Sequence, residues 1–468
     1  MADITVVGGG VAGLSAACAL AEAGLRVQLV ERRPYLGGRA SSFRHPGVGE
    51  VIDNCQHVVF GCCTHMRAFY RRIGVERLIR WSDAMTFVEP GGRQSVLGSA
   101  PLPAPLHGLP GLWAARAFDR RDKLALARAF AALLRPVPAD STETLADWLG
   151  RHGQTPGAIE RFWKLVIASA LNADLGSISL PYASMVIREL FLNSREGGRM
   201  GVSTVPLGEL YAAAGRFLEA RGGAIRLDCA VTGAQWDEGR RKWRADAGAG
   251  EAIESDALIL ALPFEALGKL LPGLPEAPAA PRLAGQAAHH EHWPILSVHL
   301  WFDRPITALD HAVLLDGDFH WLYNKSRIQP GRDGSLAYVE LVVSAARELA
   351  AVPGPEIIAR TQASLPRYFS EAGRAVLVKA AVVKEQRATF AVPPGVDAYR
   401  PEARSPWPRC YLAGDWTRTG WPSTMESAAR SGHAAAAAAA RDGGAAPPAE
   451  VRDLRPSLVA RVLSGRLR

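Results

Sequence analysis

The chain begins with a glycine-rich turn between a short apolar strand and a helix. Gly8, Gly10 and Gly13 form the pattern GxGxxG, and Glu31 ends the apolar run that follows the helix. Glycine permits a tight turn, close approach of the backbone to a pyrophosphate and close helix packing. The helix N-terminus attracts anions, and the acidic side chain accepts hydrogen bonds from ribose hydroxyl groups. This order of elements predicts a Rossmann-type βαβ unit that binds a dinucleotide.

The rest of the chain mixes helical and extended patterns, so we expect an α/β protein. Apolar residues recur at helical spacing in residues 70–78, 121–134, 207–219 and 425–441. Extended runs are expected at residues 224–227, 257–263, 295–302, 319–323, 336–343 and 410–413, with a hairpin in residues 230–247. Side chains in the run 295–302 alternate between two faces, which is typical of a strand.

Composition limits the class of protein and its partners. Of the 468 residues, 48% are hydrophobic and 21% are charged, which is typical of a globular protein and excludes a largely disordered one. The formal net charge of +8 permits an anionic ligand or an acidic membrane surface. The six cysteines form no CxxC pair, and no signal peptide precedes the first strand, so we expect a cytoplasmic protein. We also expect no bound metal and no nucleic-acid partner.

Two further motifs lie far apart in the sequence. Gly37, Gly38 and Arg39 follow the βαβ unit closely, and Leu412-Ala413-Gly414-Asp415 with Pro422-Ser423-Thr424-Met425-Glu426 lies near the other end. Together they resemble the flavin-containing amine oxidase and phytoene desaturase superfamily. Because motifs at both ends of the chain would serve one cofactor, the resemblance favours FAD over NAD.

The resemblance assigns a place on FAD to each of these residues. It implies that Gly37, Gly38 and Arg39 lie along the pyrophosphate, where a guanidinium group can bind phosphate oxygens with two parallel hydrogen bonds. Asp415 would contact the ribitol or phosphate side. The backbone of Thr424 and Met425 would approach the pyrimidine end of the isoalloxazine, and the backbone of Val231 would contact the adenine.

The same resemblance implies a Rossmann-like FAD-binding domain interleaved with an α+β substrate-binding domain. We expect the FAD-binding domain to comprise residues 1–90, 201–265 and 381–441. We expect the substrate-binding domain to comprise residues 91–200 and 266–380. Residues 442–468 would form a separate basic amphipathic tail.

Several segments resemble a narrower group, the squalene-associated FAD enzymes of hopanoid biosynthesis known as hydroxysqualene dehydroxylases. They are Asp53-Asn54-Cys55-Gln56-His57, Gly61-Cys62-Cys63, Ala170-Leu171-Asn172, Ser194-Arg195-Glu196-Gly197-Gly198-Arg199 and Gly414-Asp415-Trp416-Thr417. The resemblance implies that reduced flavin converts an apolar triterpene alcohol, hydroxysqualene, to squalene with loss of water. One departure is Cys55, where we expect glycine, and a positive φ there would strain a cysteine.

Three alternatives remain open. A carotenoid or phytoene desaturase would use the same motifs with oxidised FAD removing hydride. An amine oxidase commonly has an aromatic residue at the position of Thr424, and threonine cannot form that substrate cage. A prenyl-binding escort protein would have a related fold without needing flavin, although the intact Gly8, Gly10, Gly13 and Glu31 set argues against it. The sequence identifies no electron donor for the flavin.

Removal of a hydroxyl group requires an acid and a dry pocket. His57 and Asp53 are the candidate acids because they flank a segment expected to return toward the flavin; water is a third candidate. Either residue could instead be structural. Four aromatic residues on the expected strands suit an apolar tunnel or ordinary core packing, namely Trp293, Trp301, Trp321 and Tyr323. Trp421 could shape the cavity over the flavin or pack in the core.

Two segments suggest contact with a membrane surface. Residues 94–115 carry no charged side chain but contain prolines that would break a spanning helix, so we expect a surface-inserting loop there. In residues 447–468 apolar residues alternate with arginines, which predicts a basic amphipathic helix on an anionic membrane. A helix docked on the protein body or a frayed tail is the alternative. Membrane binding would make the protein peripheral on the inner face of the cell membrane.

Overall fold

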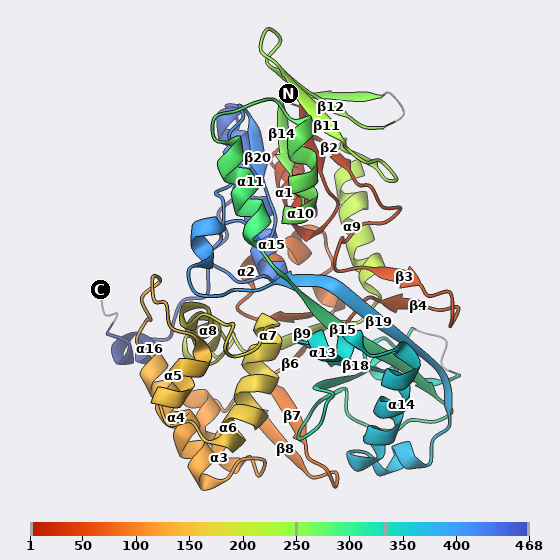
Figure 1. Ribbon diagram of the computed structural model, residues 1–468, viewed down its shortest axis with the longest axis vertical. Helices are drawn as coiled ribbons and strands as arrows, with labels where there is room; N and C mark the ends of the chain where they lie inside the picture. The colour runs from red at the N-terminus through yellow and green to blue at the C-terminus, as the bar shows by residue number, and fades with distance from the viewer. Residues whose placement is uncertain (1–2, 249–250, 332–334, 466–468) are drawn as a thin grey trace.

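The computed structural model describes residues 3–248, 251–331 and 335–465. The molecule is elongated, with a parallel sheet and its helices in the upper half of Figure 1 and a larger mixed sheet with a helical layer in the lower half. The chain crosses between the halves several times, so neither half is a continuous stretch of sequence.

The parallel sheet gathers segments from the beginning, middle and end of the chain. Its strand order is β10-β2-β1-β14-β20. The strands are β1 (Asp3–Val7), β2 (Arg26–Val30), β10 (Ala224–Arg226), β14 (Ala257–Leu260) and β20 (Cys410–Leu412). All pairings are parallel, which confirms the predicted Rossmann-like sheet. All five strands had been expected from their apolar runs.

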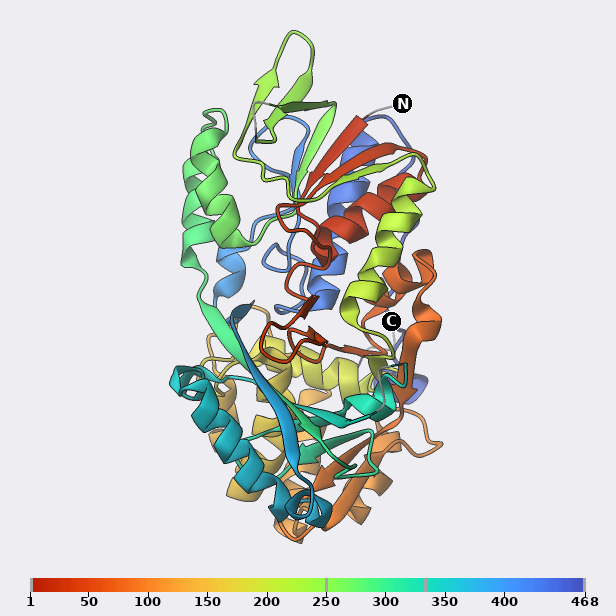
Figure 2. The same ribbon diagram turned by 90° about the vertical axis from the view of Figure 1, so that its right-hand side faces the viewer.

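Two helices pack tightly against each other beside this sheet. Helix α1 (Val11–Glu22) follows the glycine turn, and α15 (Met425–Asp442) is the alanine-rich helix expected near the C-terminus. A Cβ atom on Gly432 would lie 2.1 Å from the carbonyl oxygen of Ala12, so the two backbones touch at a position that requires glycine. Helix α9 (Leu207–Glu219) also packs on α1. Figure 2 shows these helices beside the sheet.

The second sheet has the order β19-β15-β18-β17-β16-β7-β8. Its strands are β7 (Ala84–Val88), β8 (Gln94–Gly98), β15 (His292–Phe302), β16 (His311–Leu314), β17 (Trp321–Asn324), β18 (Ala337–Val343) and β19 (Leu377–Phe390). The long strands β15 and β19 run side by side from the middle of the molecule into this half (Figure 1). Strand β7 belongs to this sheet, so the first segment of the parallel-sheet half ends before residue 84 and not at the expected residue 90. Strand β19 continues in this sheet to Phe390, although the last FAD-binding segment was expected to begin at residue 381.

The alternation predicted in β15 is confirmed, but both faces of the strand are buried. Leu296, Val298 and Leu300 belong to one hydrophobic core, whereas Ser297 and His299 lie on the other face and are fully buried. Polar side chains on that face must therefore find partners inside the protein. Ser297 donates a hydrogen bond to the carbonyl oxygen of Asn54, which ties β15 to the segment expected near the flavin.

A helical layer covers the lower half. It contains α3 (Leu109–Ala114), α4 (Arg120–Leu133), α5 (Leu145–Arg151) and α8 (Leu180–Ile187), and two π-helical segments, η3 (Ile159–Ala168) and η4 (Arg188–Leu192). Pi-helical segments are rare and are frequently found at functional sites. Both line the cavity described below.

Three smaller sheets complete the fold. They are β3 (Ser42–Arg44) with β4 (Val51–Asp53), β5 (Val58–Phe60) with β9 (Met200–Ser203) and β6 (Ile79–Ser82), and β11 (Gly233–Asp237) with β12 (Lys242–Asp246) and β13 (Ala252–Ser255). The predicted hairpin is β11–β12. The helix expected at 70–78 is instead α2 (Thr64–Arg72), which stops before Gly74, whose φ is 77°. Glycine at a positive φ is a common helix stop.

The C-terminal tail is docked on the protein body over part of its length. Only α16 (Leu458–Leu463) is helical between residue 447 and residue 465, so the long amphipathic helix expected there does not form. The backbone N–H of Ser457 donates a hydrogen bond to the carbonyl oxygen of Asn193, and the hydroxyl group of Ser457 donates one to the carbonyl oxygen of Ala104. The expected arginine and leucine positions 466–468 lie outside the described residues. No helix in the described part of the chain is long and apolar enough to cross a membrane.

Candidate active site

A cavity of about 730 Å³ connects the parallel sheet to the second sheet and the helical layer. Its size is within the range of cofactor and ligand sites. It is lined by nearly all the residues predicted to contact the cofactor: Gly8, Gly10, Glu31, Gly37, Gly38, Arg39, Val231, Gly414, Asp415, Thr424 and Met425. His57 also lines the cavity, whereas Gly13 and Asp53 do not.

The glycine turns leave a space that side chains would fill. Gly8 has a φ of 109°, and a Cβ there would lie 2.4 Å from the carbonyl oxygen of Ala261. A Cβ on Gly38 would lie 2.9 Å from the Cα of Gly10, so the two glycine motifs touch. Gly13 lies behind the turn, and its Cβ would be 1.9 Å from the oxygen of Gly8, which explains why it packs the helix without lining the cavity.

Glu31 is held rigidly at the end of β2. Its two carboxylate oxygens accept hydrogen bonds from the backbone N–H groups of Gly9 (2.6 Å) and Arg33 (2.8 Å), and the residue is only 7% exposed. A carboxylate has about four acceptor positions, so two remain for the hydroxyl groups of a ribose. The turn and the acid are thus built as one unit.

Arg39 joins the two ends of the chain. It forms an ion pair with Asp415 and donates a hydrogen bond to the carbonyl oxygen of Ala388 (3.1 Å). Asp415 also accepts a hydrogen bond from the hydroxyl of Ser423. A guanidinium group has five N–H donors, so Arg39 retains donors for a phosphate.

The start of α15 forms another wall of the cavity. Thr424 caps the helix, since its hydroxyl oxygen accepts a hydrogen bond from the backbone N–H of Ser427 (3.1 Å). Met425 accepts a weak hydrogen bond from the hydroxyl of Tyr211. Thr424 and Met425 are thereby fixed at the cavity wall, and position 424 carries no aromatic ring.

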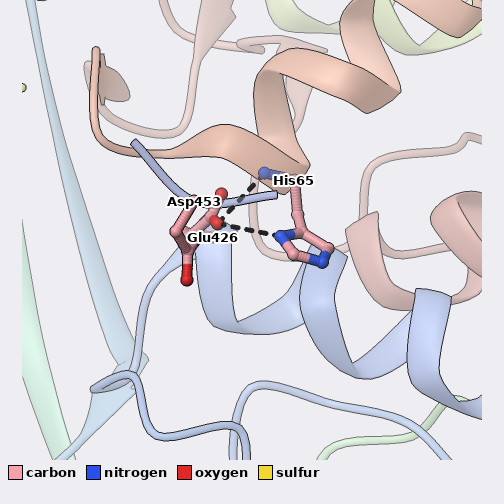
Figure 3. A group of neighbouring side chains, drawn as sticks. All are labelled: His65, Glu426 and Asp453. Carbon is pink, nitrogen blue, oxygen red and sulfur yellow. Dashed lines mark hydrogen bonds and ion pairs between the residues drawn. The ribbon is translucent and has the colours of Figure 1, made fainter. Parts of the chain in front are cut away.

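Beside this wall, three side chains that could ligate a metal ion lie close together. The ligand atoms of His65, Glu426 and Asp453 lie within 4.8 Å of one another. Figure 3 shows the three side chains gathered at the start of α2 and α15. However, Arg430 forms ion pairs with both carboxylates, and the N–H groups of His65 and Met66 donate to Glu426. The guanidinium group of Arg430 therefore already supplies positive charge to both carboxylates. The cluster joins the tail to α2 and α15.

The segment before β5 brings His57 to the cavity wall. Its Nδ1 lies 2.9 Å from the carbonyl oxygen of Cys55, and because a carbonyl only accepts, Nδ1 is the protonated nitrogen and Nε2 is left as an acceptor. Burial lowers the pKa of His57 below its usual value. The described non-glycine residues with a positive φ do not include Cys55, so the backbone strain expected there is absent.

Asp53 occupies a different environment from the one expected for an acid. It is 2% exposed, lies outside the cavity lining and accepts a hydrogen bond from the ammonium group of Lys325 (2.9 Å). Burial opposes its ionisation, but Lys325 and the hydrogen bonds from Ser42 and Leu207 outweigh burial and lower the pKa of Asp53 to about 2. A permanent carboxylate has no proton to donate, so the expectation that Asp53 is the acid does not fit its place in the structure.

Lys325 also links a second buried acid to the site. Its ammonium group lies 3.4 Å from the carboxylate of Glu340 and donates to the side-chain oxygen of Gln56 (2.8 Å). Burial raises the pKa of Glu340 to about 7, although Lys325 acts in the opposite direction. The two acids and Lys325 hold the segment that carries Gln56 and His57 in place from behind.

The far end of the cavity is mostly apolar. Its lining there includes Val166, Val186, Leu190, Phe191, Ile295 and Val342. Of the aromatic residues predicted for a tunnel, Trp321 and Tyr323 line the cavity, whereas Trp293 and Trp301 are buried in the core. Trp421 also lines it, beneath the guanidinium group of Arg430 at 4.8 Å from the ring centre.

Sequence reasoning missed three charged residues of this region. Lys325 and Glu340 are fully buried, and Glu189 lines the apolar end of the cavity. A signal was present for two of them. Glu340 is the only charged residue in the apolar run of β18, and Glu189 is the only acid in the run from Leu180 to Leu192. A charged residue in a buried apolar element indicates a buried ion pair or a site, which applies to Glu340 and to the adjacent Arg188 and Glu189.

These features fit FAD. The cradle of Gly8, Gly10 and Gly38 admits a pyrophosphate because Cβ atoms would fill it, and the start of α1 supplies partial positive charge. Glu31 provides ribose acceptors and Arg39 provides phosphate donors. The cavity then continues past Thr424 and His57 into the apolar end, which would hold a substrate next to the flavin ring.

Sequence comparisons agree with this assignment. The model of the family described as flavin containing amine oxidoreductase matches residues 11–440. The chain is 29% identical over 455 residues to a 15-cis-phytoene desaturase of Synechococcus elongatus, covering 92% of this chain and 94% of the relative. It is 26% identical over 475 residues to a probable zeta-carotene desaturase of the same organism, covering 93% and 98%.

Solved structures share the fold. Cyclohexylamine oxidase from Brevibacterium oxydans has a TM-score of 0.69 at 18% identity, covering 95% of this chain and 99% of that one. Putrescine oxidase bound to putrescine has a TM-score of 0.69 at 17% identity, covering 93% and 98%. The cofactor is FAD, and the protein is an FAD-dependent oxidoreductase. The glycine cradle, Glu31 and Arg39 line one cavity, and the family model matches most of the chain. The chain therefore belongs to the flavin-containing amine oxidoreductase family.

Proposed function

We propose that this protein reduces hydroxysqualene to squalene with loss of water. The observation that carries this proposal is a cavity that joins the FAD cradle to an apolar end bearing a few hydrogen-bonding groups, among them His57 and Glu189. A long isoprenoid chain suits the apolar wall, and a hydroxyl group gives the polar groups a partner. The sequence motifs shared with the hydroxysqualene dehydroxylases support the same substrate.

The division of labour follows from the positions of the residues. Bound in its reduced form, FAD would supply the hydride that replaces the hydroxyl group. Thr424 and Met425 hold the cavity wall at the start of α15, and the Lys325 cluster holds the segment that carries His57. His57 presents Nε2 as a hydrogen-bond acceptor, which suits it to orient a substrate hydroxyl. The apolar lining excludes water from the reacting carbon.

Desaturation of phytoene or a related carotenoid is the second candidate. The 29% identity to the Synechococcus elongatus 15-cis-phytoene desaturase favours it over most of the chain length. In that case oxidised FAD would accept hydride from the polyene. Amine oxidation is less well supported, because Thr424 provides no aromatic ring for an amine cage.

A lipid surface is the proposed partner for substrate delivery. Exposed apolar side chains lie on two contacting segments: Leu102, Leu106, Leu109 and Trp113 on one, and Leu458, Val462 and Leu463 on the other. Arg455 and Arg461 lie within the second segment. Apolar side chains beside basic ones suit an anionic bilayer, which could supply a water-insoluble triterpene.

The decisive experiment is a substrate panel. Purified holoenzyme is incubated with hydroxysqualene, squalene, phytoene or a simple amine, in parallel with chemically reduced and with oxidised FAD. Reduced enzyme should convert hydroxysqualene to squalene, and turnover in heavy water should place one deuterium at the carbon that carried the hydroxyl, because the flavin N5 hydrogen exchanges with solvent. Conversion of phytoene by oxidised enzyme, with hydroxysqualene unchanged, would establish the desaturase instead.

A further inference from the structure

The cavity contains more carboxylic acids than the cofactor needs. In the described part of the chain its lining includes Glu31, Glu189, Glu265, Glu385, Asp415 and Glu426. Glu31 is held by backbone N–H groups, Asp415 by Arg39, Glu426 by Arg430, and Glu265 lies 3.3 Å from the ring of His292. These four have partners that stabilise a carboxylate. Glu385 lies on β19, and its carboxylate accepts a hydrogen bond from the backbone N–H of Arg387 (3.3 Å).

Glu189 has a different environment, at the apolar end of the cavity. It belongs to η4, whose Leu190 and Phe191 line the same wall. One of its carboxyl oxygens accepts a hydrogen bond from the side-chain amide of Asn193 (2.8 Å), and Asn193 itself is buried. Glu189 takes part in none of the ion pairs found among the described residues. The amide fixes the orientation of the carboxyl group without supplying a neutralising charge.

The backbone around Glu189 is locked by glycines of the Ser194–Arg199 motif. A Cβ on Gly197 would lie 2.1 Å from the carbonyl oxygen of Glu189, and one on Gly198 would lie 2.4 Å from that of Leu190. The backbone N–H of Cys62 in turn donates to the carbonyl oxygen of Gly197 (3.1 Å). The Gly61–Cys63 and Ser194–Arg199 segments thus pack together and fix the position of η4 at the cavity wall. This packing accounts for Gly197 and Gly198, which FAD binding does not require.

The tail supports the same position from the other side. The carbonyl oxygen of Asn193 accepts the hydrogen bond from Ser457, and Arg430 holds Asp453 nearby. Burial raises the pKa of Glu189 and the charge of Asp453 acts in the same direction; the hydrogen bond from Asn193 and the charges of Arg188 and Arg430 oppose this rise but do not cancel it. A carboxyl group in this environment retains its proton to a higher pH than an exposed one.

We infer that Glu189 is the catalytic acid that protonates the departing hydroxyl group of the substrate. This inference rests on the proposed reduction of hydroxysqualene. The proton passes from the Glu189 carboxyl to the hydroxyl oxygen, the C–O bond breaks with its electron pair going to oxygen, and water leaves. Reduced FAD, when bound, would supply the hydride for the new C–H bond and become oxidised FAD, and the proton released in that oxidation would balance the one taken from Glu189.

The inference also separates the roles of Glu189 and His57. Burial favours the neutral form of His57, whose Nδ1–H is already donated to Cys55, so His57 accepts a hydrogen bond but has no second proton to give near neutral pH. An enzyme that uses Glu189 as its acid should lose activity as the pH rises through the raised pKa of Glu189. An enzyme that uses protonated His57 should instead lose activity above a pKa lower than that of an ordinary histidine.

The test uses Glu189→Gln, which preserves the shape and the hydrogen bond to Asn193 but cannot donate a carboxyl proton. Glu160→Gln is the matched control, because Glu160 lies on the other π-helical segment and is exposed with Lys164 as its partner. Both variants are purified with FAD and reduced chemically, and squalene formation from hydroxysqualene is measured in a single turnover across pH. Infrared difference spectra between wild type and Glu189→Gln report the carbonyl stretch of a protonated Glu189 directly.

We expect Glu189→Gln to lower the chemical step roughly a hundredfold or more while FAD and hydroxysqualene remain bound, and to lose the fall in rate at high pH. A protonated carboxyl band should disappear in this variant and persist in the control. If wild-type enzyme forms squalene and Glu189→Gln does so at the same rate, the role of Glu189 is refuted and the proposed function stands. If reduced wild-type enzyme leaves hydroxysqualene unchanged, the proposed function fails, and the role of Glu189 with it.

Discussion

Arg39 forms an ion pair with Asp415, a residue 376 positions away in the sequence. This contact closes the FAD site, because it joins the motif after the βαβ unit to the motif before α15. Ser423 donates a hydrogen bond to the other oxygen of the Asp415 carboxylate, so the position of this acid does not depend on Arg39 alone. The cofactor site therefore requires both ends of the chain.

Replacing Arg39 should weaken FAD binding. Arg39→Ala removes charge-assisted hydrogen bonds worth about 1.5–3 kcal/mol, which corresponds to a rise of roughly tenfold to a hundredfold in the Kd for FAD. The Kd is measured by quenching of flavin fluorescence on titration of the apoprotein. Arg240→Ala on the β11–β12 hairpin, which breaks an exposed pair with Glu254, serves as the control. An unchanged Kd in Arg39→Ala would place Arg39 outside the phosphate site.

Glu31→Ala should weaken FAD binding by a similar amount and also loosen the glycine turn. The variant loses the acceptors for the ribose and leaves the N–H groups of Gly9 and Arg33 without their carboxylate. Isothermal titration with FAD measures the first effect, and hydrogen exchange of the turn measures the second. Glu219→Ala, on the exposed end of α9, should change neither. Faster hydrogen exchange in the turn with unchanged affinity for FAD would show that Glu31 stabilises the turn but does not bind the ribose.

The flavin should be bound without a covalent link. Four cysteines line the cavity, namely Cys55, Cys62, Cys63 and Cys229. Burial raises the pKa of the Cys55 thiol well above its usual value, and the hydrogen bond with Cys63 together with burial does the same for Cys62. The thiol of Cys229 donates a hydrogen bond to the carbonyl oxygen of Ala247 (3.2 Å). A protonated thiol is a poor nucleophile toward the flavin ring. Acid precipitation of the holoenzyme should release all the FAD into the supernatant, where its absorbance is measured. Yellow colour retained in the washed pellet would contradict this.

Glu340 should make the protein less stable as the pH rises from about 4.5 to about 7, because its pKa is raised from 4.5 to about 7 in the folded state. Over that range the unfolded chain has lost the proton that the folded protein still holds. The loss of free energy of unfolding is at most about 1.4 kcal/mol per pH unit for one proton. Asp53 acts in a separate window, since its lowered pKa of about 2 adds stability that is lost only below about 3.8.

Glu340→Gln tests this effect because glutamine stays neutral at every pH. The free energy of unfolding is measured by denaturant titration of wild type and variant from pH 4 to pH 8. We expect the wild type to lose stability relative to the variant as the pH rises. Glu348→Gln, at an exposed position in α13 (Arg347–Ala351), should show a difference from wild type that does not change over this range. A constant difference for Glu340→Gln as well would show that folding does not raise the pKa of Glu340.

Lipid binding should depend on the exposed face of α16. Leu458, Val462 and Leu463 are 62%, 49% and 48% exposed, and replacing all three by serine leaves the contacts of Asp453 and Ser457 with the protein body in place. Co-sedimentation with anionic liposomes should fall in this variant and at high salt, because salt screens the arginines. Serine at Val376 and Val378, which are also exposed, should have no effect. Equal sedimentation of all three proteins at low salt would exclude α16 as a membrane contact.

The sequence alone determined the cofactor half of the molecule. The glycine pattern, Glu31, and the motifs at Arg39 and Asp415 depend on local geometry: positive φ at Gly8, close packing at Gly13, and a cap at Thr424. Such requirements restrict the residue type at each position, so they can be read from the sequence without knowledge of contacts. The apolar alternation predicted β15 for the same reason, since a strand has a fixed side-chain period.

The tertiary structure decided what the remaining charged residues do. Asp53 reads as a candidate acid in sequence, but folding places it beside Lys325, 272 residues away, where it is a buried anion. Glu189 belongs to no sequence motif, and it lies on the cavity wall where Gly197 and Gly198 pack against the backbone of η4. The protonation state of a carboxyl group depends on its burial and on its neighbours in space. Those neighbours are set by long-range packing, which no local pattern in the sequence records.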